Sequence, residues 1–139
     1  MKAPLPFLLC LLLCASGRSQ QKTDAGTCEQ KAQTQLDLNT CAAEKLRSED
    51  TKLDRVYQEL LARAKNDPVA TTKIRSAQEA WVAFRDAQLE ALFPADAKQD
   101  QYGSAYPMCA AAARAQLTAE RTKMLESMVH PVEGDMCSH

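Results

Sequence analysis

Prolines divide this chain into three long segments in which apolar residues recur at helical spacing. The three segments cover residues 29–66, 71–93 and 108–129, and the prolines that follow them are Pro68, Pro94 and Pro131. A residue that precedes proline disfavours the helical conformation, so a helix should stop before each proline. No segment alternates apolar and polar residues as a half-buried strand would. The sequence therefore predicts an all-α fold with three long helices.

These helices should pack as an antiparallel bundle, because the link between the first two is short. Residues 94–107 form the one long loop, which lies between the second and third helices. On a helical wheel, Leu53 and Leu60 share a face of the first helix, Trp81 and Phe84 share a face of the second, and the third gathers its apolar residues in the same way. The apolar residues on one face of the third helix are Leu117, Met124, Leu125 and Met128.

The predicted apolar faces also carry charged residues. Asp50 and Arg85 lie equally far along the chain from the turn at 67–68, so they should face each other. Asp86 should point elsewhere, because adjacent residues lie on different sides of a helix. An unpaired buried charge is costly. We therefore predict that Asp50, Arg85 and Arg121 are structural buried polar residues, with Asp50 bonded to Arg85. A catalytic acid beside an electrophilic arginine is the alternative.

The N-terminal residues have the pattern of a secretory signal peptide. Residues 1–19 contain an early lysine, an apolar run from Leu5 to Leu13 and then small residues, and the run is too short to span a membrane. The mature protein would be a single domain, 20–139, with a helical core at 28–129 and a tail at 130–139. This predicts a periplasmic or secreted protein. Lipidation at Cys14 would tie it to a membrane, but Leu13 stands where a lipobox needs a small residue.

Four cysteines remain after removal of the signal, and an even number in a small exported domain is typical of disulfides. Zinc is the alternative, but there is no close pair of cysteines and both histidines lie in the tail. A helix from 109 to 129 measures about 30 Å, and the extended tail beyond it reaches at most about 27 Å. We therefore predict one bridge among Cys28, Cys41 and Cys109. Cys137 then bonds either to the remaining cysteine of these three or to a second chain. The candidates are Cys28, Cys41, Cys109 and Cys137.

Charge and motifs exclude several classes of function. Without Lys2 and Arg18 of the signal, the chain keeps 15 basic and 18 acidic residues, a formal charge of −3 that does not suit a nucleic-acid-binding protein. There is no phosphate-binding loop or nucleophile elbow, and the helical segments contain no histidine. We therefore expect no enzyme, no cofactor and no metal.

The long loop is the candidate partner-binding surface. Loops on rigid scaffolds often carry recognition, and tyrosine is favoured at interfaces. An ordinary solvated connection is the alternative. The candidate residues are Asp96, Asp100, Tyr102, Ser104 and Tyr106.

The order and spacing of several residues resemble the LprI-like lysozyme inhibitor family, which comprises small secreted or lipid-anchored bacterial proteins. The matching positions are Asn39, Cys41, Asp50, Leu53, Tyr57, Ala77, Gln78, Trp81, Arg85, Asp86, Gly103, Ser104, Cys109, Arg121 and Leu125. Two positions depart from the family pattern: Gln88 replaces a cysteine, so the usual second disulfide cannot form in the usual way, and Asp54 replaces an asparagine.

The resemblance implies a helical, disulfide-bonded protein that is not an enzyme and that binds and inhibits a lysozyme or another peptidoglycan-cleaving enzyme. Two further functions fit the same features. One is a periplasmic immunity protein against the toxin of a competitor, and the other is a structural or stress-related envelope factor without an enzyme target.

Overall fold

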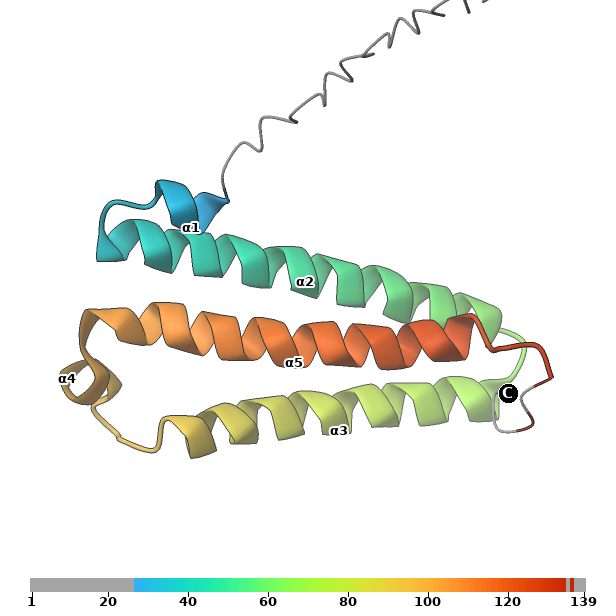
Figure 1. The fold of residues 1–139 in the computed structure, drawn as a ribbon. Helices are drawn as coiled ribbons and strands as arrows, with labels where there is room; N and C mark the ends of the chain where they lie inside the picture. Colours follow the sequence, from blue (N-terminus) through green and yellow to red (C-terminus); the bar gives the residue numbers. More distant parts are fainter. Residues whose placement is uncertain (1–26, 135, 137–139) are drawn as a thin grey trace, which may run out of the picture.

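The computed structural model describes residues 27–134 and residue 136. Within that part of the chain the regular structure is entirely helical, which confirms the predicted fold class (Figure 1). Its elements are α1 (Cys28–Lys31), α2 (Gln35–Arg63), α3 (Pro68–Leu92), α4 (Lys98–Tyr102), the 3-10 turn η1 (Gly103–Ala105) and α5 (Tyr106–Val129). None of the helices in the described ranges is long and apolar enough to cross a membrane. The predicted signal peptide and Cys137 lie outside the described residues.

The first predicted helix is in fact two helices, so its expected extent was wrong. Thr34 starts α2 with a capping box: its hydroxyl accepts from the Asp37 amide at 3.1 Å, and the Asp37 carboxylate accepts from the Thr34 amide at 2.9 Å. This reciprocal bonding satisfies amides that an isolated helix start leaves unpaired. Asp67 caps α3 in a related way, accepting from the Ala70 amide at 2.9 Å, and Pro68 takes the first helical position.

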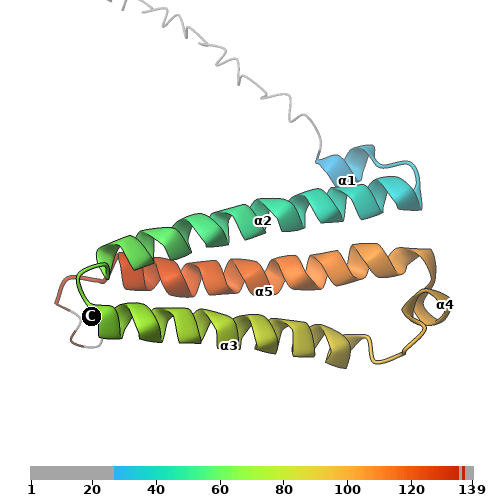
Figure 2. The ribbon, with the colours of Figure 1, turned by 180° about the vertical axis from the view of Figure 1, so that it is seen from behind.

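The helix α5 lies between α2 and α3 in both ribbon views (Figures 1 and 2). The helices α2 and α5 run parallel and pack along their length, whereas α3 runs antiparallel to both and makes its main contacts with α5. The expectation that α2 and α3 face each other directly was therefore wrong, because α5 lies between them. The last of the three long helices, α5, occupies the middle position.

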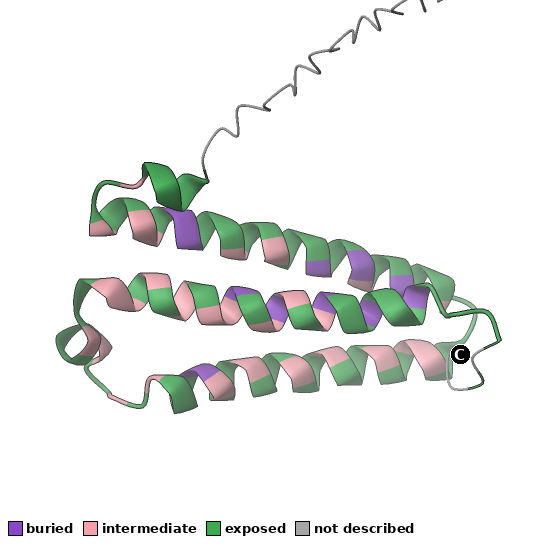
Figure 3. Ribbon diagram, viewed as in Figure 1, coloured by how far each residue is buried: buried purple, intermediate pink, exposed green. Residues whose placement is uncertain are grey.

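The core lies toward the end of the bundle where α2 and α5 finish (Figure 3). Leu125 and Val129 of α5 are each only 1% exposed. They pack with three residues of α2, while Ile74 and Trp81 of α3 pack against the cluster. The three α2 residues are Leu53, Val56 and Leu60.

The expected apolar face of α5 was partly wrong. Met124 and Met128 are exposed, whereas Thr118 and Thr122 are buried. The Thr122 hydroxyl donates to the Thr118 carbonyl at 2.9 Å, and the Thr118 hydroxyl donates to Asp50 at 3.3 Å. Both threonines are thus hydrogen-bonded, so burying them carries little penalty.

A disulfide joins Cys28 to Cys41, with 5.7 Å between the Cα atoms. It ties α1 to the first turns of α2, which confirms the predicted bridge among the first three cysteines. Cys109, at the start of α5, is exposed and has no disulfide partner among the described residues. Because α1 contributes no buried residue of its own, this bridge is its main attachment to the bundle.

Candidate functional site

The predicted long loop is largely folded. Residues 94–107 contain α4, η1 and the first residues of α5, and they cover one end of the bundle (Figure 1). We call this segment the α4 tip. The expectation of an irregular loop was therefore wrong, and the structure explains the difference by three sets of contacts beneath the tip.

The first set of contacts is aromatic. Phe93 meets Tyr102 and Tyr106 edge to face, with ring centroids 5.5 and 5.3 Å apart, and the two tyrosine rings stack at 5.9 Å. Such pairs add stability beyond the area they bury. The Tyr102 hydroxyl also accepts from the Ala95 amide at 3.2 Å. The aromatic contacts therefore join the end of α3, α4 and the start of α5 to one another.

The second set of contacts centres on Lys98. Its ammonium donates to the Glu90 carboxylate at 2.7 Å and to the carbonyls of Phe93 and Ala95 at 2.9 and 3.3 Å. A cation at this point binds carbonyls that the end of α3 leaves unpaired. The hydrogen bond that Lys98 donates to the Glu90 carboxylate raises the pKa of Lys98 above its ordinary value. Lys98 thus joins α4 to the end of α3.

The third set of contacts fixes the tip to α2. The Asn39 side-chain amide donates to the Ser104 carbonyl at 3.1 Å, and Gln35 contacts the Met108 sulfur at 3.8 Å. Just before these contacts the chain turns at Gly103, whose φ of 67° is a conformation that favours glycine. The tip is therefore attached to both long helices that flank α5.

The five predicted partner-binding residues divide into two groups. Tyr102 and Tyr106 are half-buried in the aromatic cluster. Asp96, Asp100 and Ser104 are exposed. Of the five predicted residues, the two aspartates and the serine are therefore accessible to a partner. The sequence pattern did not separate them from the tyrosines, which pack inside the tip.

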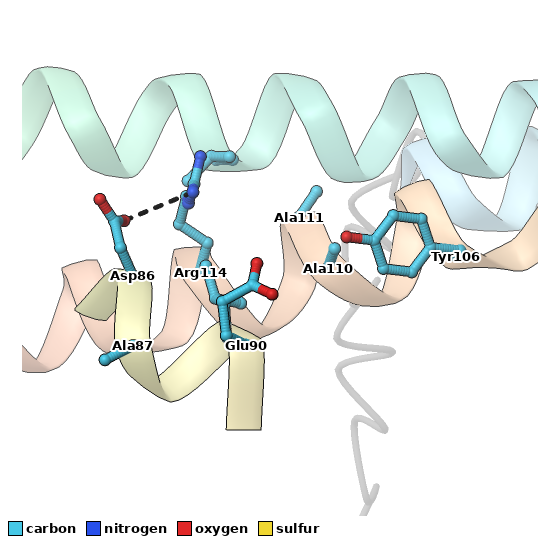
Figure 4. Close-up of a pocket in the computed structure, with 9 residues that line it drawn as sticks. Asp86, Ala87, Glu90, Tyr106, Ala110, Ala111 and Arg114 are labelled. Carbon is cyan, nitrogen blue, oxygen red and sulfur yellow. Dashed lines mark hydrogen bonds and ion pairs between the residues drawn. The ribbon is translucent and has the colours of Figure 1, made fainter. Parts of the chain in front are cut away.

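A groove of about 470 Å³ lies beside the tip. Leu46 of α2, Glu90 of α3 and Arg114 of α5 line it, together with small alanines (Figure 4). The Arg114 guanidinium pairs with Asp86 of α3 at 3.4 Å, while its buried Nε atom has no hydrogen-bond partner in the described part of the chain. The groove therefore combines an apolar floor with charges of both signs. The residue pattern within any one helix does not reveal this groove, because its walls come from three separate helices.

The predicted pair between Asp50 and Arg85 is wrong. Arg85 bonds to its neighbour Asp86 instead, with its Nη2 atom 3.0 Å from the carboxylate, and lies over the Trp81 ring at 5.2 Å. Asp50 is exposed and accepts from Thr118 of α5. The rotation between adjacent helical residues separates their Cβ atoms, but the long arginine side chain folds back across that separation. The central position of α5 supplies Asp50 with a different partner.

Arg121 of α5 also lies against the Trp81 ring. Its guanidinium is 6.0 Å from the ring centroid, and its Nε atom donates to Gln78 at 3.1 Å. Burial lowers the pKa of Arg121 from its usual value, but a guanidinium stays charged in proteins. Cation–π contacts of this kind stabilise packing between helices. Trp81 and its two arginines therefore connect α3 to α5.

The described residues contain no group of three or more His, Cys, Asp or Glu side chains that could hold a metal ion. Their cysteines comprise one disulfide and one exposed thiol, and their only histidine is His130 at the end of α5. The groups brought together at the tip and in the groove are suited to hydrogen bonding and charge pairing with another molecule.

Comparison with known proteins gives two matches. The model of a family described as "Lysozyme inhibitor LprI" matches residues 28–125. An uncharacterized protein of Rhizobium meliloti (strain 1021) is 31% identical over 146 residues, which covers 96% of this chain and 100% of that protein. No solved structure matches the chain significantly.

Proposed function

The chain belongs to the LprI family of lysozyme inhibitors, and we propose that it is an exported, non-enzymatic protein that binds a lysozyme and covers its substrate cleft. Inhibition of this kind requires a rigid surface that fits the cleft, and no catalytic group. We assign the inhibitory surface to the α4 tip. The observation that carries this assignment is the pair of exposed carboxylates, Asp96 and Asp100, on a segment held by contacts from beneath.

The charges of the tip favour a basic partner. Neither Asp96 nor Asp100 has an ion-pair partner among the described residues. The one lysine of the tip, Lys98, is engaged by Glu90. The tip therefore presents uncompensated negative charge to solvent, which steers association toward a positively charged surface around a cleft.

The internal contacts of the tip favour tight binding. A flexible loop loses conformational entropy when it binds, whereas a segment already fixed in its bound conformation does not. The aromatic cluster, the Lys98 hydrogen bonds and the Asn39–Ser104 bond fix this segment before any partner arrives. The groove beside the tip offers room for a side chain of the partner, with Arg114 and Glu90 as hydrogen-bonding groups.

The test is a turbidity assay of cell-wall lysis with lysozymes of the c, g and phage types. The test variant replaces Asp96 and Asp100 by lysine, and Tyr102 is left in place because it holds the tip together. The control variant replaces Glu79 and Glu126 by lysine, which changes the charge equally at exposed sites on α3 and α5. Each exposed charge contributes up to about 1 kcal/mol, so we expect the tip variant to inhibit on the order of tenfold less well and the control to change little.

Two outcomes contradict the proposal at different levels. If the unmodified protein inhibits no class of lysozyme, the proposed function is wrong. If the unmodified protein inhibits and the tip variant inhibits equally well, the function stands but the interface lies on a helix face.

A further inference from the structure

Exposed apolar side chains gather at the end of the molecule opposite the α4 tip. Of the nine large apolar residues that are exposed in the described part of the chain, five lie where α3 begins and α5 ends. They are Val69, Met124, Met128, Val132 and Met136. A concentration of apolar surface on one end of a small protein indicates a binding site, and the proposed contact with a lysozyme at the other end does not use it.

This end also contains a groove of about 500 Å³, within the usual range of about 300–1,000 Å³ for small-molecule sites. All three long helices contribute to it, so it is a recess between helices rather than a flat patch. Its apolar walls come from Leu60, Ala64, Ala70, Ile74, Met128 and Pro131. Methionine adapts its shape to irregular apolar ligands, and Met128 is 47% exposed at the edge of the recess.

Two cations, Arg63 of α2 and Lys73 of α3, complete the lining of the groove. Arg63 shares a long contact of 3.4 Å with Glu59, in which both side chains are about half exposed (53% and 46%). Such a pair is weak, so Arg63 can easily exchange Glu59 for another anion. Lys73 has no ion-pair partner among the described residues. The groove therefore joins apolar walls to available positive charge.

We propose that this groove binds a fatty acid, with the alkyl chain against Leu60, Ile74 and Met128 and the carboxylate beside Arg63 and Lys73. The charge of the lining selects an anionic head group, and the apolar walls select a hydrocarbon chain. The position of the groove between three helices favours one alkyl chain lying along it over the surface of a bilayer. The site is separate from the α4 tip, so it does not depend on the proposed inhibition of lysozyme.

The test is isothermal titration calorimetry of the full mature chain with saturated fatty acids of increasing length, each below its micelle-forming concentration. Each buried methylene should tighten binding about fourfold until the groove is filled. Met128→Glu should weaken binding more than tenfold. Lys73→Glu, at an exposed position where the fold tolerates the change, should weaken it several-fold. The matched controls are Leu36→Glu, exposed near the opposite end, and Arg75→Glu on the same helix as Lys73.

Several results would overturn the proposal. One is no measurable binding at any chain length, and another is equal binding by the test variants and their controls. A protein that sediments as a dimer, and dissociates in Met128→Glu, would show that a second copy fills the groove. Association with anionic vesicles but not with free fatty acid would show that the end contacts a bilayer instead. The melting temperature of each variant establishes that it is folded.

Discussion

Replacing Leu125 by alanine should be among the most damaging single changes in this protein. Leu125 is 1% exposed and lies in the cluster where α2 and α5 meet. The substitution removes three carbon groups at about 0.8 kcal/mol each, and an unfilled cavity adds up to about 2 kcal/mol. We therefore expect the free energy of unfolding to fall by about 2.5–4.5 kcal/mol, a large part of the stability of a small domain.

Urea unfolding followed by circular dichroism and by the fluorescence of Trp81, the only tryptophan, measures this loss. Coincident transitions from the two probes establish that the free energy is well defined. The control is Met124→Ala at the preceding position, where the side chain is 58% exposed and the expected loss is below about 0.5 kcal/mol. Equal losses in the two variants would refute the assigned orientation of α5.

Three further predictions concern polar contacts. Lys98→Met removes the hydrogen bonds that join α4 to the end of α3, so amide exchange in residues 98–102 should accelerate on the order of tenfold, and unchanged exchange would contradict the role of Lys98. Hydrogen bonds from Thr34 and from backbone amides lower the pKa of Asp37, so the stabilisation that its carboxylate provides is present above the pKa of the unfolded state and is lost as the pH falls through the lower pKa of the folded state. NMR spectra across an acid titration should show the start of α2 fraying at low pH, and Asp37→Asn should abolish this pH dependence. A pH dependence that persists in that variant would contradict the role of Asp37. A double-mutant cycle on Arg85 and Asp50 should give no coupling, and a coupling above about 1 kcal/mol would restore the direct pair.

Helix ends could be read from the sequence where proline marks them, but the break between α1 and α2 could not. No proline or glycine interrupts residues 29–34, and the break depends on capping by Thr34 and Asp37. A threonine followed three residues later by an acidic residue is the one signal that could have located it. The same limitation hid α4, where Lys98 binds the carbonyls of Phe93 and Ala95 just beyond the end of α3.

The polar partners were less predictable than the helices, because they depend on the position of α5. An estimate from the turn between α2 and α3 places Asp50 opposite Arg85, but the middle helix provides Thr118 as the partner of Asp50. The apolar face of α5 was ambiguous for a related reason. A helix with neighbours on two sides buries a broad face, and its alanines and threonines do not mark one direction.

The central position of α5 also has a consequence for the order of folding. The contacts that join α2 to α5 connect residues far apart in the chain, such as Asp50 and Thr118, which are 68 positions apart. The turn between α2 and α3 forms locally. Most of the packing of α2, however, requires α5, which is synthesised after α2 and α3. Closing such a long loop costs entropy before any contact repays it. This small helical protein should therefore fold more slowly than a bundle whose successive helices pack on each other, and on a ribosome it gains most of its stability only after α5 has emerged.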